Sequence, residues 1–180
     1  MKLILIGYRG CGKTTIAQAL SQRLNIPWVD VDDVVESHAG KSIREIFADS
    51  GEPEFRRLER LAVSELLARQ PLIVSAGGGS ILNADTRRDF QAAGPVVWLT
   101  APVETILARL ETDSKTADRR PNLTTAGGAD EVRQLLARRE PLYRETATWE
   151  IPTENRVIPD IVEDILQRLA ALPSPTEAAR

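Results

Sequence analysis

Short apolar runs alternate with longer amphipathic segments along this chain. The runs are rich in Val, Ile, Leu and Trp and predict buried strands at 2–6, 28–30, 71–75, 95–99 and 148–151. Between them, apolar residues recur at helical spacing and predict helices near 15–24, 30–38, 42–47, 54–69, 85–93, 102–110, 130–147 and 159–172. Strands that alternate with helices form parallel sheets, so we expect a three-layer α/β/α fold with five parallel strands.

Local signals mark where some of these helices begin and break. Asp33 with Glu36, and Ser42 with Glu45, have the spacing of a capping box at a helix start. The segment 50–53, Ser-Gly-Glu-Pro, predicts a break between the short helix before it and the long helix after it.

One polar segment interrupts the pattern. Residues 111–129 have no apolar period, which predicts a loop, and we interpret it as a lid over about 111–128. The chain of 180 residues has the length of one domain, so we expect a single domain over 1–180 with a frayed tail at 173–180.

Composition narrows the classes of partner. The net charge of −3, with no basic block, argues against a nucleic-acid binder. The chain shows no signal peptide and no apolar run of membrane-spanning length, so we expect a cytoplasmic protein without a membrane partner. The single cysteine, Cys11, excludes an internal disulfide, and the single histidine, His38, is expected at the surface.

The segment Gly7 to Thr14, GYRGCGKT, follows the first apolar run and has the spacing of a phosphate loop. Its glycines allow consecutive N–H groups to surround an anion at the start of a helix. Lys13 would contact the β and γ phosphates, and the Thr14 hydroxyl would complete a Mg²⁺ shell. The residues expected around the nucleotide are Gly10, Cys11, Gly12, Lys13, Thr14 and Thr15. The motif predicts a nucleoside triphosphate and leaves the acceptor open.

Polar and glycine residues follow the second and third predicted strands. Asp30 and Asp32 belong to an acidic cluster whose self-repulsion a metal or cation would relieve. Gly77, Gly78 and Gly79 would allow a ligand to lie against bare backbone. Because the carboxyl ends of parallel strands meet at one edge of the sheet, we expect both groups beside the phosphate loop.

Two arginines have more than one interpretation. Arg56 lies in a heavily charged helix with glutamates at 52, 54 and 59, and these residues alone favour a solvated ion pair for it, as for Arg57 and Arg60. Arg139 falls on an otherwise apolar stripe, just before Pro141, which predicts a break or bend. Its partner would be an anionic substrate or a buried carboxylate.

Taken in order, these segments resemble the shikimate kinase family over nearly the whole chain. The resemblance rests on GYRGCGKTT, VDVDD, GKSIREIFADSGEPEFRRLE, SAGGGS, RRPNL and RREPLYRETA. It implies the fold of phosphate-loop kinases, with a substrate-binding insert at about 31–60, and transfer of the ATP γ-phosphate to the 3-hydroxyl of shikimate, in the biosynthesis of chorismate and aromatic amino acids.

On the acceptor side, the resemblance implies that Arg56 and Arg139 hold the carboxylate of shikimate and that Gly77 to Gly79 line its ring. It implies that Asp32 holds the hydroxyl groups and either takes the proton or only positions the hydroxyl.

On the donor side, the resemblance implies that Asp30 lies near Mg²⁺ through water and that Arg120 moves onto the phosphates. Arg119 is the alternative, because the choice depends only on the proline that follows Arg120. Arg109 and the loop from Pro152 to Arg156 resemble adenine-side contacts.

Two rival functions remain open from the sequence. One is another small-molecule kinase of the same fold, such as a gluconate or nucleoside monophosphate kinase. The other is a regulatory module that binds ATP without turnover. We expect a monomeric enzyme with a small-molecule acceptor.

Overall fold

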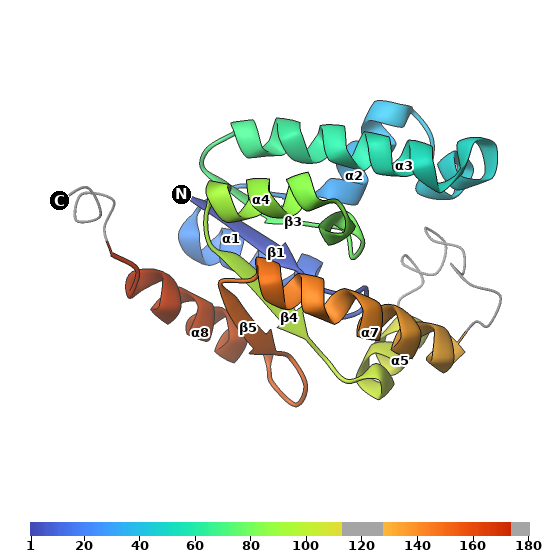
Figure 1. The fold of residues 1–180 in the computed structure, drawn as a ribbon. Helices are drawn as coiled ribbons and strands as arrows, with labels where there is room; N and C mark the ends of the chain where they lie inside the picture. The colour runs from blue at the N-terminus through green and yellow to red at the C-terminus, as the bar shows by residue number, and fades with distance from the viewer. Residues whose placement is uncertain (113–127, 174–180) are drawn as a thin grey trace.

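Five parallel strands in the order β2-β3-β1-β4-β5 form the sheet at the centre of the molecule (Figure 1). The computed structural model describes residues 1–112 and 128–173. The strands are β1 (Lys2–Ile6), β2 (Trp28–Asp30), β3 (Leu72–Ser75), β4 (Val96–Thr100) and β5 (Trp149–Pro152). The helices are α1 (Lys13–Leu24), α2 (Val31–Ala39), α3 (Ile43–Ala68), η1 (Ser80–Leu82), α4 (Ala84–Ala93), α5 (Val103–Thr112), α7 (Gly128–Thr146) and α8 (Ile158–Ala170). The predicted α/β fold with five parallel strands is confirmed.

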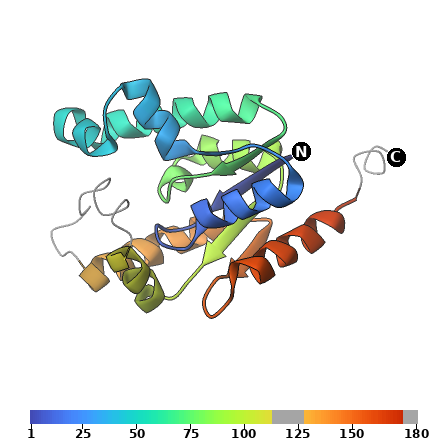
Figure 2. The same ribbon diagram turned by 180° about the vertical axis from the view of Figure 1, so that it is seen from behind.

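The central strand β1 is buried on both faces, which explains why its sequence is a continuous apolar run. Ile4 and Ile6 pack into the core on the side of α2, α3, α4 and α7. Leu3 and Leu5 pack into the core on the side of α1 and α8, because successive side chains of a strand point to opposite faces. Figures 1 and 2 show these two groups of helices on opposite sides of the sheet.

The start of α2 differs from the prediction. Its N-cap is Asp30, whose Oδ1 accepts a hydrogen bond from the N–H of Asp32 at 3.0 Å. Glu36 instead accepts a hydrogen bond from the N–H of Ile43 at 3.0 Å, and so joins the end of α2 to the start of α3. The capping box predicted for Asp33 and Glu36 is therefore wrong, because the last residue of β2 already caps the helix.

The predicted cap and break of α3 are confirmed. The Ser42 hydroxyl accepts a hydrogen bond from the N–H of Glu45, and the Glu45 carboxylate accepts one from the N–H of Ser42. Gly51 has φ 76° and ψ 178°, so it interrupts the helical backbone. A residue with a side chain would be strained in that conformation, and glycine therefore permits the kink.

Some boundaries in the second half also differ. The predicted loop over 111–129 is helical at both ends, because α5 extends to Thr112 and α7 begins at Gly128. The rest of the predicted lid, with Arg119 and Arg120, lies outside the described residues, as does the tail from 174 onward. Pro141 lies inside α7, which continues through it, so of the break or bend predicted there the break does not occur.

The parallel arrangement brings three loops to one edge of the sheet. β1 pairs with β3, and β3 pairs with β2, where Asp30 lies opposite Ser75 at the carboxyl ends. The loops that follow these strands carry the phosphate motif, the acidic cluster and the glycines. None of the helices in residues 1–112 and 128–173 combines the length and apolar character needed to cross a membrane.

Candidate active site

The phosphate loop has the backbone conformation that its glycines predict. Gly10 and Gly12 have φ of 77° and 95°, in the left-handed region, and Gly12 is the N-cap of α1. Helix α1 begins at Lys13, two residues earlier than predicted. The Lys13 ammonium donates hydrogen bonds to the carbonyls of Gly7 and Tyr8, each at 2.9 Å. The loop therefore presents the start of a helix and one ammonium group on the same short segment.

Asp30, at the end of β2, is hydrogen-bonded to the first turn of α1 and to the end of β3. Its Oδ2 accepts hydrogen bonds from the Thr14 hydroxyl at 3.1 Å and from the Ser75 hydroxyl at 2.9 Å. Burial first, and the negative charge of Asp32 second, raise the pKa of the Asp30 carboxyl above its ordinary value. The acidic cluster thus lies against the phosphate loop, as predicted from the order of the strands.

Arg56 contacts the end of the glycine loop. A Cβ atom added to Gly79 would lie 2.5 Å from one terminal nitrogen of Arg56, so only a glycine leaves room for the guanidinium there. Arg56 donates to Glu52 at 2.9 Å and to Glu59 at 2.7 Å. Glu59 is 3% exposed and also accepts a hydrogen bond from the Ser80 hydroxyl at 2.6 Å.

Two neighbouring arginines of α3, Arg57 and Arg60, form ion pairs away from the glycine loop. Arg57 pairs with Glu54 at the surface, as predicted. Arg60 instead pairs with Asp89 of α4 at 2.5 Å, so the expectation of a partner within its own helix is wrong. His38, at the end of α2, is exposed as predicted and lies 3.1 Å from Glu65.

Arg139 is brought to the same glycine loop from α7. It is 5% exposed, and one terminal nitrogen donates to the carbonyl of Gly78 at 3.2 Å. Its guanidinium also lies over the ring of Tyr8, 5.7 Å from the centroid. Among the described residues, no salt bridge joins it to a carboxylate within 4.0 Å.

Arg109 links the phosphate loop to the segment after β5. It donates to the carbonyl of Gly10 at 3.3 Å and to the hydroxyl and carbonyl of Thr153 at 2.9 and 3.0 Å. Arg156 turns toward α8 and pairs with Asp164 at 3.1 Å. The two arginines predicted on the adenine side therefore flank one loop, although Arg156 already has a carboxylate partner.

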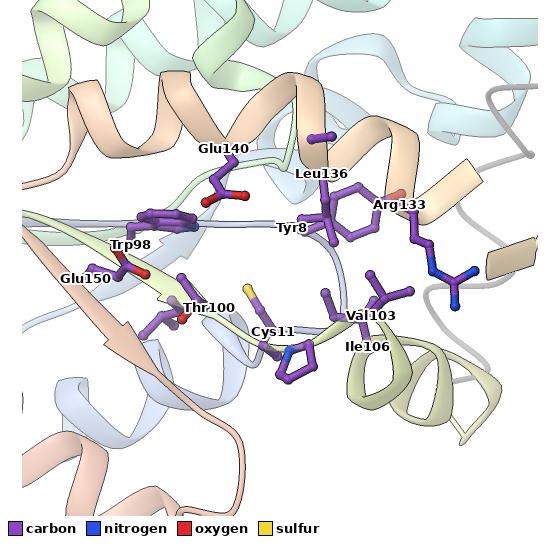
Figure 3. Close-up of a pocket in the computed structure, with 14 residues that line it drawn as sticks. Tyr8, Cys11, Trp98, Thr100, Val103, Ile106, Arg133, Leu136, Glu140 and Glu150 are labelled. Carbon is purple, nitrogen blue, oxygen red and sulfur yellow. The ribbon is translucent and has the colours of Figure 1, made fainter. Parts of the chain in front are cut away.

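A pocket of about 340 Å³ lies between β4, α5 and α7, and Tyr8 and Cys11 of the phosphate loop line part of it. Figure 3 shows Trp98 at one end, Arg133 at the other, and the Cys11 thiol between them. Cys11 is a free thiol and is only 1% exposed. The pocket is lined by neither Arg56 nor Arg139. It is therefore separate from the arginine pair.

Comparisons with known proteins agree with this geometry. The sequence model of the shikimate kinase family matches residues 9–170. A shikimate kinase from Rhodopirellula baltica is 46% identical over 165 residues, which are 92% of this chain and 88% of the relative. One from Pseudomonas savastanoi is 40% identical over 171 residues, or 95% of this chain and 97% of the relative. The chain belongs to the shikimate kinase family.

Solved structures support the same assignment. The shikimate kinase from Acinetobacter baumannii in complex with shikimate aligns with a TM-score of 0.87 and 35% identity, over 94% of this chain and 93% of that chain. A gluconokinase from Sinorhizobium meliloti, at 16% identity and a TM-score of 0.57, shares only the fold. The chain is an enzyme with shikimate kinase activity in the shikimate pathway, which leads to the aromatic amino acids, and its family implies the use of ATP.

Three residues of the site were not predicted as such. The sequence places Glu59 among the possible ion-pair partners of its helix, and it gives Ser80 and Tyr143, which lie in SAGGGS and RREPLYRETA, no separate role. Glu59 gave one available signal: it lies four residues after Phe55 and three before Ala62, on the buried face of α3. Tyr143 gave none, because its partner is 65 residues away in the sequence.

Proposed function

We propose that this chain transfers the γ-phosphate of ATP to the 3-hydroxyl of shikimate, with Mg²⁺ bound beside the nucleotide. The observation that carries the proposal is the meeting of Arg56 and Arg139, from different helices, at one glycine loop beside the phosphate motif. An acceptor that carries a carboxylate matches two guanidinium groups. Arg56 already contacts Glu52 and Glu59, whereas no salt bridge joins Arg139 to a carboxylate of the described residues, so a plain sugar acceptor would leave the charge of Arg139 without an anionic partner.

The donor side fits a triphosphate. The left-handed glycines and the start of α1 can direct N–H groups at phosphate oxygens. Lys13 would exchange its two loop carbonyls for phosphate oxygens of the nucleotide. Thr14 and Asp30 offer the oxygen atoms that Mg²⁺ prefers, the latter directly or through water. When bound, Mg²⁺ would neutralise charge on the phosphates.

On the acceptor side, Arg56 and Arg139 would hold the carboxylate while Gly77, Gly78 and Gly79 lie against the ring. Asp32, in the first turn of α2, would accept a hydrogen bond from the reacting hydroxyl and direct its oxygen toward the γ-phosphate. This division of labour suits phosphoryl transfer, where positioning and charge neutralisation supply most of the rate.

The adenine end of the nucleotide would lie near the loop that follows β5. Arg109 and the loop that ends at Arg156 would contact the adenine side. Arg120, outside the described residues, would close onto the phosphates and limit access of water. We propose that residues 1–180 form one domain that works as a monomer.

A coupled assay of ADP release tests the function. The purified chain is given ATP, Mg²⁺ and one acceptor at a time: shikimate, gluconate, or each nucleoside monophosphate. We expect turnover with shikimate at least a hundredfold above that with the others. Faster turnover with gluconate or a nucleotide would refute the proposal. Nucleotide binding without turnover of any acceptor would instead favour a regulatory module.

A further inference from the structure

The Tyr143 hydroxyl is a buried polar group that contacts the glycine loop directly. Tyr143 is 0% exposed, and its hydroxyl donates to the Gly78 carbonyl at 2.5 Å. Arg139, one helical turn earlier on α7, donates to the same carbonyl at 3.2 Å. A carbonyl oxygen has two lone pairs, so it can accept both bonds. One backbone atom thus joins the loop, the tyrosine and the arginine.

The surroundings hold this tyrosine in place. Its ring stacks on Trp98 of β4, with centroids 5.6 Å apart and planes 18° apart. Burial raises the pKa of the phenol, so the hydroxyl stays protonated and remains a donor. Figure 3 shows Trp98 below α7, at one end of the neighbouring pocket.

Gly78 is also close to the phosphate loop on its other side. A Cβ atom added there would lie 3.4 Å from the carbonyl of Gly7, 3.5 Å from the nitrogen of Arg9 and 3.6 Å from the Tyr143 hydroxyl. The Gly78 peptide is therefore held between the donor loop and α7. A small rotation of this peptide would change the direction of the carbonyl that Arg139 contacts.

We propose that Tyr143 is a positioning residue for the acceptor: its hydroxyl holds the Gly78 carbonyl and thereby sets the direction in which Arg139 presents its guanidinium. Without the hydroxyl, Arg139 becomes the only donor to that carbonyl from α7. The guanidinium is then drawn toward the loop and away from the substrate carboxylate. This inference rests on the proposed role of Arg139 in binding shikimate.

Tyr143→Phe tests the proposal, because it keeps the ring and its stacking on Trp98 and removes only the hydroxyl. We expect the KM and the Kd for shikimate to rise roughly 5- to 10-fold, which corresponds to the loss of one hydrogen bond. The KM for ATP should stay within about twofold, and kcat within about threefold, because the groups around the phosphates are unchanged.

Thr146→Val is the matched control. Thr146 lies on the same helix, is 1% exposed, and donates its hydroxyl to the carbonyl of Leu142 at 2.6 Å. Both variants lose one buried hydroxyl, so both should lower Tm, but only Tyr143→Phe should change shikimate binding. A fall in Tm with no change in shikimate KM in either variant would overturn the proposal.

Two further variants separate a positioning role from general damage to the core. In a double-mutant cycle, Tyr143→Phe should add little to the shikimate KM of Arg139→Lys, because the tyrosine acts through the arginine. Fully additive effects would contradict this.

If Tyr143→Phe does not fold, Trp98→Phe is the alternative variant, because it keeps the tyrosine hydroxyl but weakens the stacking on its ring. We then expect a smaller rise in the shikimate KM, and an unchanged KM would refute the proposal. Failure of the proposed function is distinguishable, because the wild-type chain would then show no ADP release with shikimate.

Discussion

Asp30 shows how a residue of the site can oppose stability. Its raised pKa comes mainly from burial and from the charge of Asp32, although the Asp32 N–H and the Ser75 hydroxyl stabilise the carboxylate. A carboxyl whose pKa is higher in the folded state than in the unfolded chain contributes its full stability below the ordinary value, near 3.8. That contribution declines as the pH rises through the raised pKa. At neutral pH the ionised group therefore destabilises the fold.

Asp30→Asn should raise stability and lower activity. The amide keeps the shape and the cap but removes the buried charge, so we expect a higher Tm than that of the wild type at pH 7.5. The difference should shrink as the pH falls through the raised pKa of Asp30, because the wild-type carboxyl becomes protonated. Calorimetry across pH measures this, with the exposed Asp33→Asn as a control that should not gain stability. A lower Tm at neutral pH would contradict the argument.

Asp32→Asn addresses the chemistry of the acceptor hydroxyl. An amide cannot take a proton and accepts hydrogen bonds more weakly than a carboxylate, so we expect kcat to fall at least about 100-fold. Steady-state kinetics with saturating ATP and shikimate measures the effect, and Asp33→Asn again serves as the comparison. Near-normal turnover would remove Asp32 from the proposed mechanism.

Arg139→Ala should separate the two substrates. Loss of a buried, charge-assisted contact to a carboxylate predicts a rise of at least tenfold in the shikimate KM, with the ATP KM within about threefold. Arg138→Ala, which removes the exposed neighbouring arginine of α7, is the matched control and should resemble wild type. Equal losses for ATP and shikimate would refute the carboxylate assignment.

At the scale of elements, the glycine loop after β3 lies between the arginine of α3 and the arginine of α7. Gly79 has φ −108°, so a side chain there brings no backbone strain. Its added Cβ would nevertheless lie 2.5 and 2.6 Å from the terminal nitrogens of Arg56. Those atoms are the mobile end of a long side chain, so the fold can adjust while the arginine is displaced.

Gly79→Ala should therefore raise the shikimate KM about fivefold or more, with Tm within about 2 °C of wild type. Gly78→Ala is the comparison, because its Cβ would make only contacts of 3.4–3.6 Å. It should have the smaller effect on KM. The reverse order, or a large fall in Tm for Gly79→Ala, would show that the loop does not act through Arg56.

At the scale of the whole molecule, the sheet places the donor and acceptor groups on adjacent strand ends, so each substrate should stabilise the fold through its own contacts. A ligand at 100 times its Kd adds about 2.7 kcal/mol, which corresponds to a rise in Tm of roughly 5–10 °C for a chain of this size. Thermal shift with ADP and Mg²⁺, or with shikimate alone, measures this. Lys13→Ala should remove most of the nucleotide shift and keep the shikimate shift, whereas Arg139→Ala should do the reverse. Loss of both shifts in either variant would contradict two separate contact sets.

The features that could be predicted from the order of residues are the local ones. The phosphate loop, the cap formed by Ser42 and Glu45, the kink at Gly51 and the five strands all depend on residues within a few positions of each other. The carboxyl ends of parallel strands meet at one edge of the sheet. From this rule and the positions of the strands in the sequence, Asp30 could be predicted to lie beside the phosphate loop, where it contacts Thr14. Resemblance to a family supplied the roles that are proposed for Arg56 and Arg139.

Contacts between distant segments were decided only by packing. Arg60 forms its salt bridge with Asp89 of α4 and not with a glutamate of its own helix. Glu59 is buried and accepts a hydrogen bond from the Ser80 hydroxyl. Asp30 replaced Asp33 as the cap of α2, because the backbone at the end of β2 directs its carboxylate back to the helix. The Tyr143 hydroxyl donates a hydrogen bond to the Gly78 carbonyl, which lies 65 residues away in the sequence. Such pairs have no signature in spacing, since a buried polar group takes whichever partner the crossing of helices and strands brings within hydrogen-bonding distance.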